Sequence, residues 1–134
     1  MPPPGQDLPS RVLLITDDVS VSDAVSRVLR LEGFEVWAAF SAQEGVRLAK
    51  GHAPDAVLID LRTPAVANLP LVQALRREAG LSRSPIAVVT GDHHPDAAVL
   101  GELDRLGATV RYKPFWLTEL VSLARDLLRI PARP

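Results

Sequence analysis

Five short apolar runs, each followed by a segment with helical periodicity, are the feature that most limits the fold of this chain. The runs are apolar at nearly every position, which is typical of strands buried on both faces of a parallel sheet. Helices between such strands cover the two faces in turn. We therefore predict an α/β fold with a doubly wound, parallel five-stranded sheet. The predicted strands span 12–15, 35–39, 56–59, 86–89 and 109–112, and the predicted helices 21–31, 42–50, 69–79, 96–106 and 116–129.

Three local signals define the ends of the predicted helices. Ser41 and Glu44 match a capping box, in which each side chain bonds a free backbone amide of the first turn. Asn68 is expected to cap the third helix, which has Pro70 in its first turn. Gly107 is expected to end the fourth helix in a left-handed conformation.

The chain of 134 residues is long enough for one core and one domain. Residues 1–10 contain four prolines without periodicity and are predicted to be a flexible tail. The folded domain is expected to span 11–130, and residues 131–134 to form a second tail. Because so little chain follows the last helix, we expect either that the domain acts through its own surface or that the sequence is an excised piece of a larger protein.

Composition excludes several classes of function. The chain contains no cysteine, so it has no disulfide framework and no thiolate metal site, and a cytoplasmic setting is the default expectation. Its 15 basic and 16 acidic residues give a net charge of −1, which does not favour nucleic-acid binding. No apolar run approaches the length needed to span a bilayer, so we expect no membrane insertion.

Polar residues follow four of the predicted strands directly. They are Asp17 and Asp18, Asp60, Thr90, and Lys113. Because the carboxyl ends of parallel strands share one edge of the sheet, these residues are expected to converge there. Three carboxylates in a small volume repel one another unless a cation is present, and Mg²⁺ suits an oxygen-only site. Together with an ammonium and a hydroxyl, they suggest phosphoryl transfer onto an aspartate.

These motifs, in this order and at these spacings, resemble the receiver domain of two-component response regulators. The resemblance extends over about residues 11–128 and rests on four short segments: LITDD, VLIDLRTP, VVTG and KPF. It implies a flavodoxin-like fold with the strand order 2-1-3-4-5.

The resemblance also implies a role for each site residue. Asp60 would accept a phosphoryl group from a phosphohistidine of a sensor histidine kinase or phosphotransfer protein. Asp17 and Asp18 would hold Mg²⁺ together with Asp60 and the backbone carbonyl of Arg62. Downstream, a protein partner would read the phosphorylated state, with the chain as a monomer or a phosphorylation-dependent homodimer.

Lys113 and Thr90 would respond to the phosphoryl group once it is attached. The resemblance implies that Lys113 pairs with the phosphoryl oxygens and that Thr90 moves toward them, which rearranges the surface around the fourth helix. It also implies a cis peptide bond between Lys113 and Pro114.

Departures from the usual pattern of the family lead to two further hypotheses. Val110 replaces the aromatic residue that commonly lies three positions before the lysine, and Tyr112, on the same side of the strand, is a candidate substitute. Arg62 and Asp92 lie two residues after the acceptor and the threonine respectively. We hypothesise that an ion pair between them shields the phosphoaspartate from water.

Two other functions remain open at this stage. Asn68, which replaces a common glycine, and Val110 are compatible with an interaction module that does not use phosphorylation. A hydrolase with an aspartate nucleophile, Mg²⁺ and a lysine is a weaker alternative, since no substrate-binding segment is visible. The run Arg76-Arg77-Glu78 is interpreted as a solvated helix face.

Overall fold

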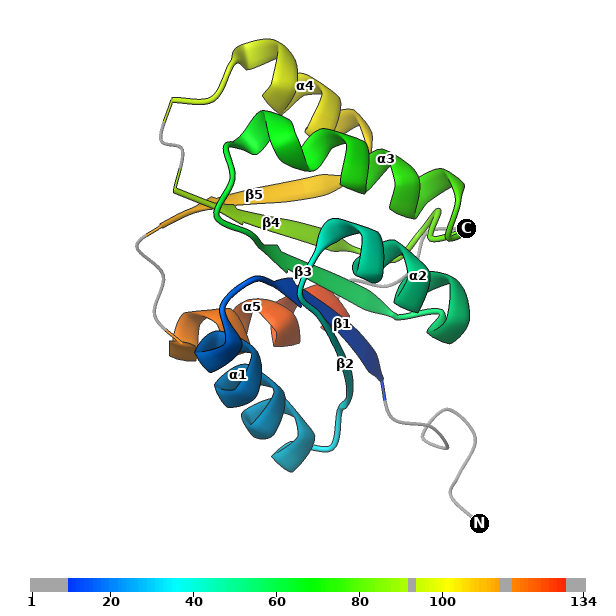
Figure 1. Ribbon diagram of the computed structural model, residues 1–134, viewed down its shortest axis with the longest axis vertical. Helices are drawn as coiled ribbons and strands as arrows, with labels where there is room; N and C mark the ends of the chain where they lie inside the picture. Colours follow the sequence, from blue (N-terminus) through cyan, green and yellow to red (C-terminus); the bar gives the residue numbers. More distant parts are fainter. Residues whose placement is uncertain (1–9, 92–93, 114–116, 130–134) are drawn as a thin grey trace.

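The computed structural model describes residues 10–91, 94–113 and 117–129, and within them it shows a five-stranded parallel sheet (Figure 1). The strand order is β2-β1-β3-β4-β5, as predicted. The strands are β1 (Arg11–Thr16), β2 (Glu35–Ala39), β3 (Ala56–Asp60), β4 (Ile86–Thr90) and β5 (Ala108–Tyr112). The predicted tails lie almost entirely outside the described residues.

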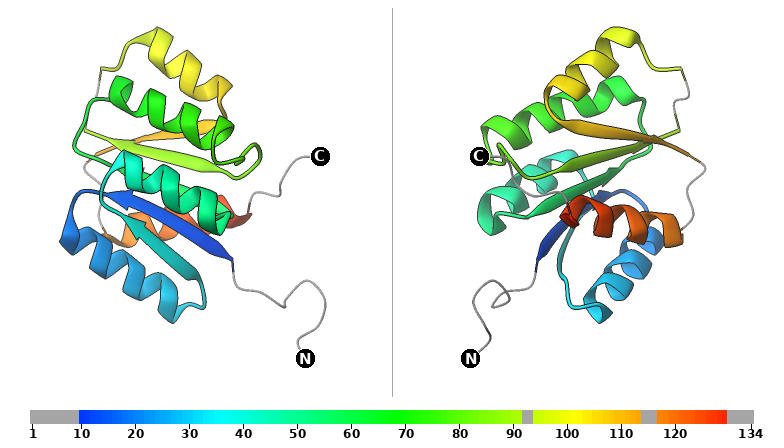
Figure 2. Two further views of the ribbon diagram at one scale, coloured as in Figure 1. Left: turned by 45° about the vertical axis from the view of Figure 1, so that its right-hand side comes forward. Right: turned by 180° about the vertical axis from the view of Figure 1, so that it is seen from behind.

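The helices cover both faces of the sheet, as a doubly wound fold requires. They are α1 (Val19–Leu31), α2 (Ala42–His52), α3 (Leu69–Arg77), α4 (Ala97–Arg105) and α5 (Leu117–Arg129), with a short 3-10 turn η1 (Ala65–Asn68) before α3. Helices α1 and α5 pack on one face, and α2, α3 and α4 pack on the other (Figures 1 and 2). No helix in the described part of the chain is long and apolar enough to cross a membrane.

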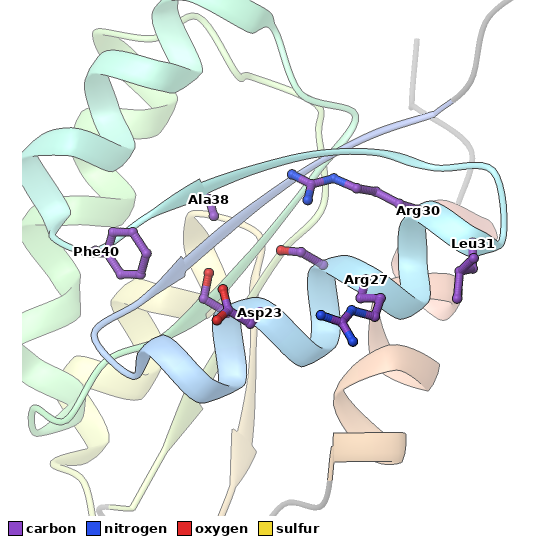
Figure 3. A pocket seen from close by; sticks show the side chains of 8 residues that line it. Asp23, Arg27, Arg30, Leu31, Ala38 and Phe40 are labelled. Atoms are coloured by element: carbon purple, nitrogen blue, oxygen red, sulfur yellow. The ribbon is translucent and has the colours of Figure 1, made fainter.

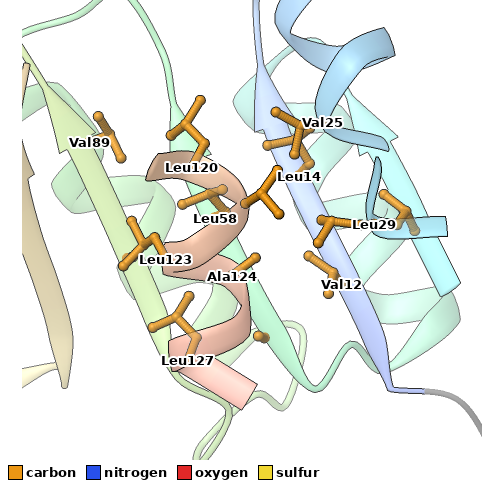
Figure 4. Close-up of a cluster of buried hydrophobic side chains, with 14 residues drawn as sticks. Val12, Leu14, Val25, Leu29, Leu58, Val89, Leu120, Leu123, Ala124 and Leu127 are labelled. Carbon is orange, nitrogen blue, oxygen red and sulfur yellow. The ribbon is translucent and has the colours of Figure 1, made fainter. Parts of the chain in front are cut away.

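The alternation of side chains along the strands divides the core into two layers. In β1, Val12 and Leu14 pack against α1 and α5 (Figure 4), whereas Leu13 and Ile15 pack against the helices of the opposite face. All four side chains are buried. Burial of apolar area on both faces is the main stabilising contribution to such a sheet, and it explains why the strands are apolar at successive positions.

The helix ends follow the sequence signals with one exception. Ser41 Oγ accepts a hydrogen bond from the Glu44 amide at 3.2 Å, so the predicted Ser41 cap of α2 is confirmed. Glu44 Oε1 accepts from the amide of Phe40, the residue before the cap, at 2.9 Å, so the reciprocal half of the capping box is shifted by one residue. Gly107 adopts a φ of 76° after α4, as predicted. The cap predicted for Asn68 is wrong.

Asn68 is buried beneath the loop after β3 and makes no capping hydrogen bond. Its Nδ2 instead donates to the Pro64 carbonyl at 3.5 Å. The backbone of Asn68 is helical, because η1 leads directly into α3, and a residue in that conformation cannot place its side chain over the following amides.

The interpretation of Arg76 as part of a solvated helix face is also wrong. Its half-buried guanidinium donates to four backbone carbonyls near the amino ends of β4 and β5. The acceptors are the carbonyls of Leu81, Ser84, Leu106 and Gly107. Arg76 therefore ties α3 to the chain segments that precede both strands.

Strand register brings the polar strand ends to one edge of the sheet. Thr16 lies opposite Asp60 between β1 and β3, and Thr90 lies opposite Tyr112 between β4 and β5. The residues that follow Thr16 and Tyr112 in sequence are Asp17 and Lys113. The backbone ladder thus sets the spacing between the acidic residues before any side-chain contact forms.

Candidate functional site

Asp60 is the most buried charged side chain at the carboxyl edge of the sheet. The residue is 6% exposed, and Lys113 Nζ lies 2.8 Å from its Oδ1. The contact lacks the directional geometry of a hydrogen bond, so it is an ion pair. A buried carboxylate without an opposite charge is strongly disfavoured, and Lys113 supplies that charge. As expected, the two side chains come together.

Arg62 lies against Asp17 and Asp18. Its backbone amide donates to Asp17 Oδ2 at 3.2 Å, and its Nε lies 3.8 Å from Asp17 Oδ1. Its Nη2 donates to Asp18 Oδ2 at 3.4 Å. The side chain of Arg62 is 70% exposed, so these contacts form at the surface of the site.

Asp18 also caps α1 and is held in place by it. Its Oδ1 accepts a hydrogen bond from the Val21 amide at 3.1 Å. This backbone hydrogen bond is the largest cause that lowers the pKa of Asp18 below its ordinary value, and the Arg62 guanidinium adds to it. These contacts therefore favour the ionised form of Asp18.

Thr90 and Lys113 are linked through the backbone. Thr90 is fully buried at the end of β4, and its carbonyl accepts a hydrogen bond from the Lys113 amide at 2.8 Å. Tyr112, opposite Thr90 in the sheet, is 42% exposed. Thr90, Tyr112 and Lys113 thus lie close together at one edge, but a substitution of Tyr112 for the missing aromatic residue stays a prediction.

A cleft opens beside the Asp60–Lys113 pair. Its volume is about 520 Å³, and the residues that line it come from the loops after β3, β4 and β5. They are Leu61, Arg62, Thr63, Pro64, Gly91 and Lys113. The cleft is large enough for a small anionic group to approach the Lys113 ammonium, which pairs with Asp60.

The donor chemistry of the site fits a hard divalent cation, although its carboxylates do not converge on one point. Asp17, Asp18 and Asp60 offer only oxygen, which Mg²⁺ prefers. Among residues 10–91, 94–113 and 117–129, no three Asp, Glu, His or Cys side chains form a group that holds a metal ion. The reason is visible in the ion pairs, because Asp60 faces Lys113 while the acidic pair faces Arg62.

Two hypotheses involve residues outside the described part of the chain. The shielding pair between Arg62 and Asp92 is one of them, because Asp92 is not described. The cis bond before Pro114 is the other. What the structure does place is the Arg62 guanidinium, and it lies with Asp17 and Asp18. Sequence reasoning missed this contact, although the register of β1 with β3 was the signal that could have revealed it.

A second and larger pocket, of about 630 Å³, lies between α1 and the end of β2 (Figure 3). Asp23, Arg27 and Arg30 of α1 and Phe40 after β2 are among the residues that line it. None of the predicted site residues does so. Arg30 Nη2 donates to the Val36 carbonyl at 3.0 Å, so part of the charge in this pocket is used to hold β2 against α1.

The family model of the response regulator receiver domain matches residues 12–125. The chain belongs to this family. The matched range includes Asp17, Asp18, Asp60, Thr90 and Lys113. A receiver domain acts as a signalling switch of a two-component system.

Similar proteins agree with this assignment. The receiver domain is 37% identical over 119 residues to the transcriptional regulatory protein PrrA of Mycobacterium tuberculosis, a match that covers 89% of this chain and 50% of PrrA. It is 32% identical to the DNA-binding dual master transcriptional regulator RpaA of Synechocystis, with 49% of RpaA covered. The chain thus spans about half the length of these curated relatives.

A solved structure supports the fold independently. The chemotaxis protein CheY4 of Vibrio cholerae matches with a TM-score of 0.73 and 26% identity, over 90% of this chain and 99% of CheY4. The flavodoxin-like architecture predicted from the motifs is confirmed by this match and by the strand order.

Proposed function

We propose that this receiver domain takes a phosphoryl group from a phosphohistidine of a sensor histidine kinase or phosphotransfer protein onto Asp60, in a Mg²⁺-dependent reaction. The observation that carries the proposal is the buried Asp60 carboxylate with Lys113 Nζ at 2.8 Å, beside an open cleft. Asp60 is the nucleophile, and Lys113 is the fixed positive charge toward which the transferred oxygens move.

In the reaction, a carboxylate oxygen of Asp60 forms a bond to phosphorus while the bond from phosphorus to the histidine nitrogen breaks. The histidine nitrogen keeps the electron pair of that bond. Little covalent chemistry is required of the protein, so positioning and charge neutralisation account for most of the rate. Asp17, Asp18, Asp60 and the carbonyl of Arg62 would hold Mg²⁺, which supplies additional positive charge to the phosphoryl oxygens.

The phosphoryl group then changes which surface arrangement is populated. Thr90 is buried next to the cleft and hydrogen-bonded through its carbonyl to Lys113, so a new anion at Asp60 acts on both residues. The proposed consequence is a shift in the surface around α4 that a protein partner reads in the cytoplasm. The half-length match to PrrA and RpaA makes transcriptional control one context for this output.

Intact-mass spectrometry tests the proposal directly. With Mg²⁺ and a small phosphodonor such as acetyl phosphate, the wild-type protein should gain one labile phosphoryl group. Asp60→Asn should gain none, while Asp104→Asn, which removes an exposed carboxylate of α4, should behave as the wild type. An unmodified wild type at all Mg²⁺ concentrations would instead favour the interaction module, and sustained release of phosphate from diverse phosphoesters the hydrolase.

A further inference from the structure

Arg62 holds both members of the acidic pair with its guanidinium. Its Nε is 3.8 Å from Asp17 Oδ1, and its Nη2 is 3.4 Å from Asp18 Oδ2. These two side chains, with Asp60, are the carboxylates of the proposed metal site. A cation belonging to the protein therefore already pairs with the carboxylates that a divalent ion would use.

The charge balance of the site shows why this matters. Lys113 offsets Asp60, and Arg62 offsets part of the charge on Asp17 and Asp18. With Arg62 in place, the acidic pair has less negative charge to attract an ion, and its oxygens are already hydrogen-bond acceptors. The carboxylates contact the Lys113 ammonium, the Arg62 guanidinium and the backbone amides of Arg62 and Val21. This dispersal matches the lack of a convergent metal group among the described residues.

We propose that the Arg62 side chain is a built-in competitor for the divalent cation, so that the ion binds only when the guanidinium leaves Asp17 and Asp18. This inference rests on the proposed function, because it concerns the same metal site. It assigns Arg62 a positioning role: the side chain sets how much metal is needed to prepare the site.

The backbone of Arg62 can stay in place while its side chain moves. Its amide is anchored on Asp17 Oδ2 at 3.2 Å, and its carbonyl is the proposed metal ligand. The side chain is 70% exposed and borders the open cleft, so solvent and the cleft both offer it room. Displacement thus requires a change of rotamer and no rearrangement of the sheet.

The expected size of the effect follows from the strength of exposed ion pairs. When the binding-competent arrangement is only partly populated, the apparent dissociation constant rises by the inverse of that fraction. Two exposed contacts of ordinary strength correspond to a change of about three- to tenfold in apparent affinity. Competition of this size weakens the apparent affinity for the metal without preventing its binding.

The test compares metal binding in the full chain and in matched variants. Calorimetric titration with Mg²⁺, and electron paramagnetic resonance with Mn²⁺, should give dissociation constants about three- to tenfold lower for Arg62→Met than for the wild type. Arg62→Lys keeps a charge but loses the planar fork and should fall between them. Arg47→Met is the control, since Arg47 is equally exposed at 70% and pairs with Glu44 on α2.

A second readout follows the side chain itself. The Nε–H resonance of Arg62, assigned by its absence in Arg62→Met, should shift as Mg²⁺ is added to the wild type, with the same midpoint as the calorimetric titration. Equal metal affinities in the wild type and Arg62→Met, or weaker binding in the variant, would overturn the inference and leave the proposed function intact. If none of the proteins binds either metal, the proposed function itself is wrong.

Discussion

Two arginines occupy opposite edges of the same sheet and serve different purposes. Arg62, at the carboxyl edge, is largely exposed and pairs with two carboxylates. Arg76, at the amino edge, is half-buried, and its guanidinium contacts four backbone carbonyls, the nearest at 2.5 Å from Leu81. Burial lowers the pKa of Arg76 below its ordinary value. Arg62 is therefore a cation that another cation can replace, whereas Arg76 is a fixed part of the structure.

The two arginines differ because Arg76 binds backbone carbonyls and Arg62 binds carboxylates. Removal of Arg76 takes the side-chain donor away from the part-buried carbonyls of Leu81, Ser84 and Leu106, which precede β4 and β5. Carboxylates at the carboxyl edge can exchange one cation for another. The stability of the fold should therefore depend strongly on the contacts at the amino edge. Metal affinity should depend on the contacts at the carboxyl edge.

Arg76→Met should produce the largest loss of stability. We expect the free energy of unfolding to fall by about 2–4 kcal/mol, because several hydrogen bonds from a charged donor are lost at once. Urea denaturation followed by circular dichroism measures this value. The neighbouring Arg77 is exposed on the same helix, so Arg77→Met should change the free energy of unfolding by less than about 0.5 kcal/mol. Similar losses in the two variants would contradict the role given to Arg76.

Ser41→Ala should have an intermediate effect at the carboxyl edge. The hydroxyl caps α2 through the Glu44 amide, and loss of such a cap destabilises a protein by about 1 kcal/mol. Its Mg²⁺ affinity should equal that of the wild type, because Ser41 contacts none of the site carboxylates. A changed metal affinity in Ser41→Ala would show that residues at the carboxyl edge other than Arg62 also influence Mg²⁺ binding.

Arg62→Met should change the metal-free stability by less than about 1 kcal/mol, since its ion pairs are exposed. Addition of Mg²⁺ should then stabilise the variant more than the wild type, because a ligand that binds the folded state more tightly stabilises it further. Thermal unfolding at several Mg²⁺ concentrations measures both quantities. Equal metal-induced shifts in melting temperature in the two proteins would show that Arg62 does not compete with Mg²⁺.

Glu32→Gln should give the smallest effect, and one that depends on pH. Glu32 pairs with Arg125 of α5, with Glu32 Oε1 at 2.6 Å from Arg125 Nε, and this hydrogen bond lowers the pKa of Glu32 below its ordinary value of 4.5. A lowered pKa in the folded state contributes stability above that ordinary value, and the contribution is lost as the pH falls through the folded pKa. Glu32→Gln should therefore unfold at a slightly lower temperature at pH 7.

The same difference should disappear in acid. Melting temperatures of the wild type and Glu32→Gln should approach each other as the pH falls below 4.5. The exposed pair joins α1 to α5 on the face away from Arg76, so Arg76→Met should lose stability at both pH values. A pH-independent gap for Glu32→Gln would mean that the ion pair is not its cause.

The strands and their polar ends were predictable because each depends on a short segment of sequence. Uniform apolar runs specify buried parallel strands, and the residue after each run must lie at the carboxyl edge, which is why Asp60 and Lys113 were found. The cap at Ser41 and the stop at Gly107 are equally local. All of these signals can be evaluated without knowledge of which elements are neighbours.

Contacts between distant segments were not predictable in the same way. Arg76 looks like an ordinary surface residue until the loop before β4 and the end of α4 are placed beside it. The expected cap at Asn68 failed because η1 continues into α3 and changes the backbone at that residue. The contact of Arg62 with the acidic pair depends on the register of β1 and β3, which no single segment contains.

That register has a consequence for how this domain tolerates change. Thr16 and Asp60 are opposite each other in adjacent hydrogen-bonded strands, so the separation of the acidic pair from Asp60 is set by the backbone ladder. A deletion of one residue inside β3 would turn Asp60 to the other face of the sheet, because side chains alternate along a strand. The side chain at position 62, by contrast, is exposed, so it can be exchanged without moving the backbone of either carboxylate position. New regulatory side chains at position 62 can therefore be grafted into this domain while its reactive core stays in place.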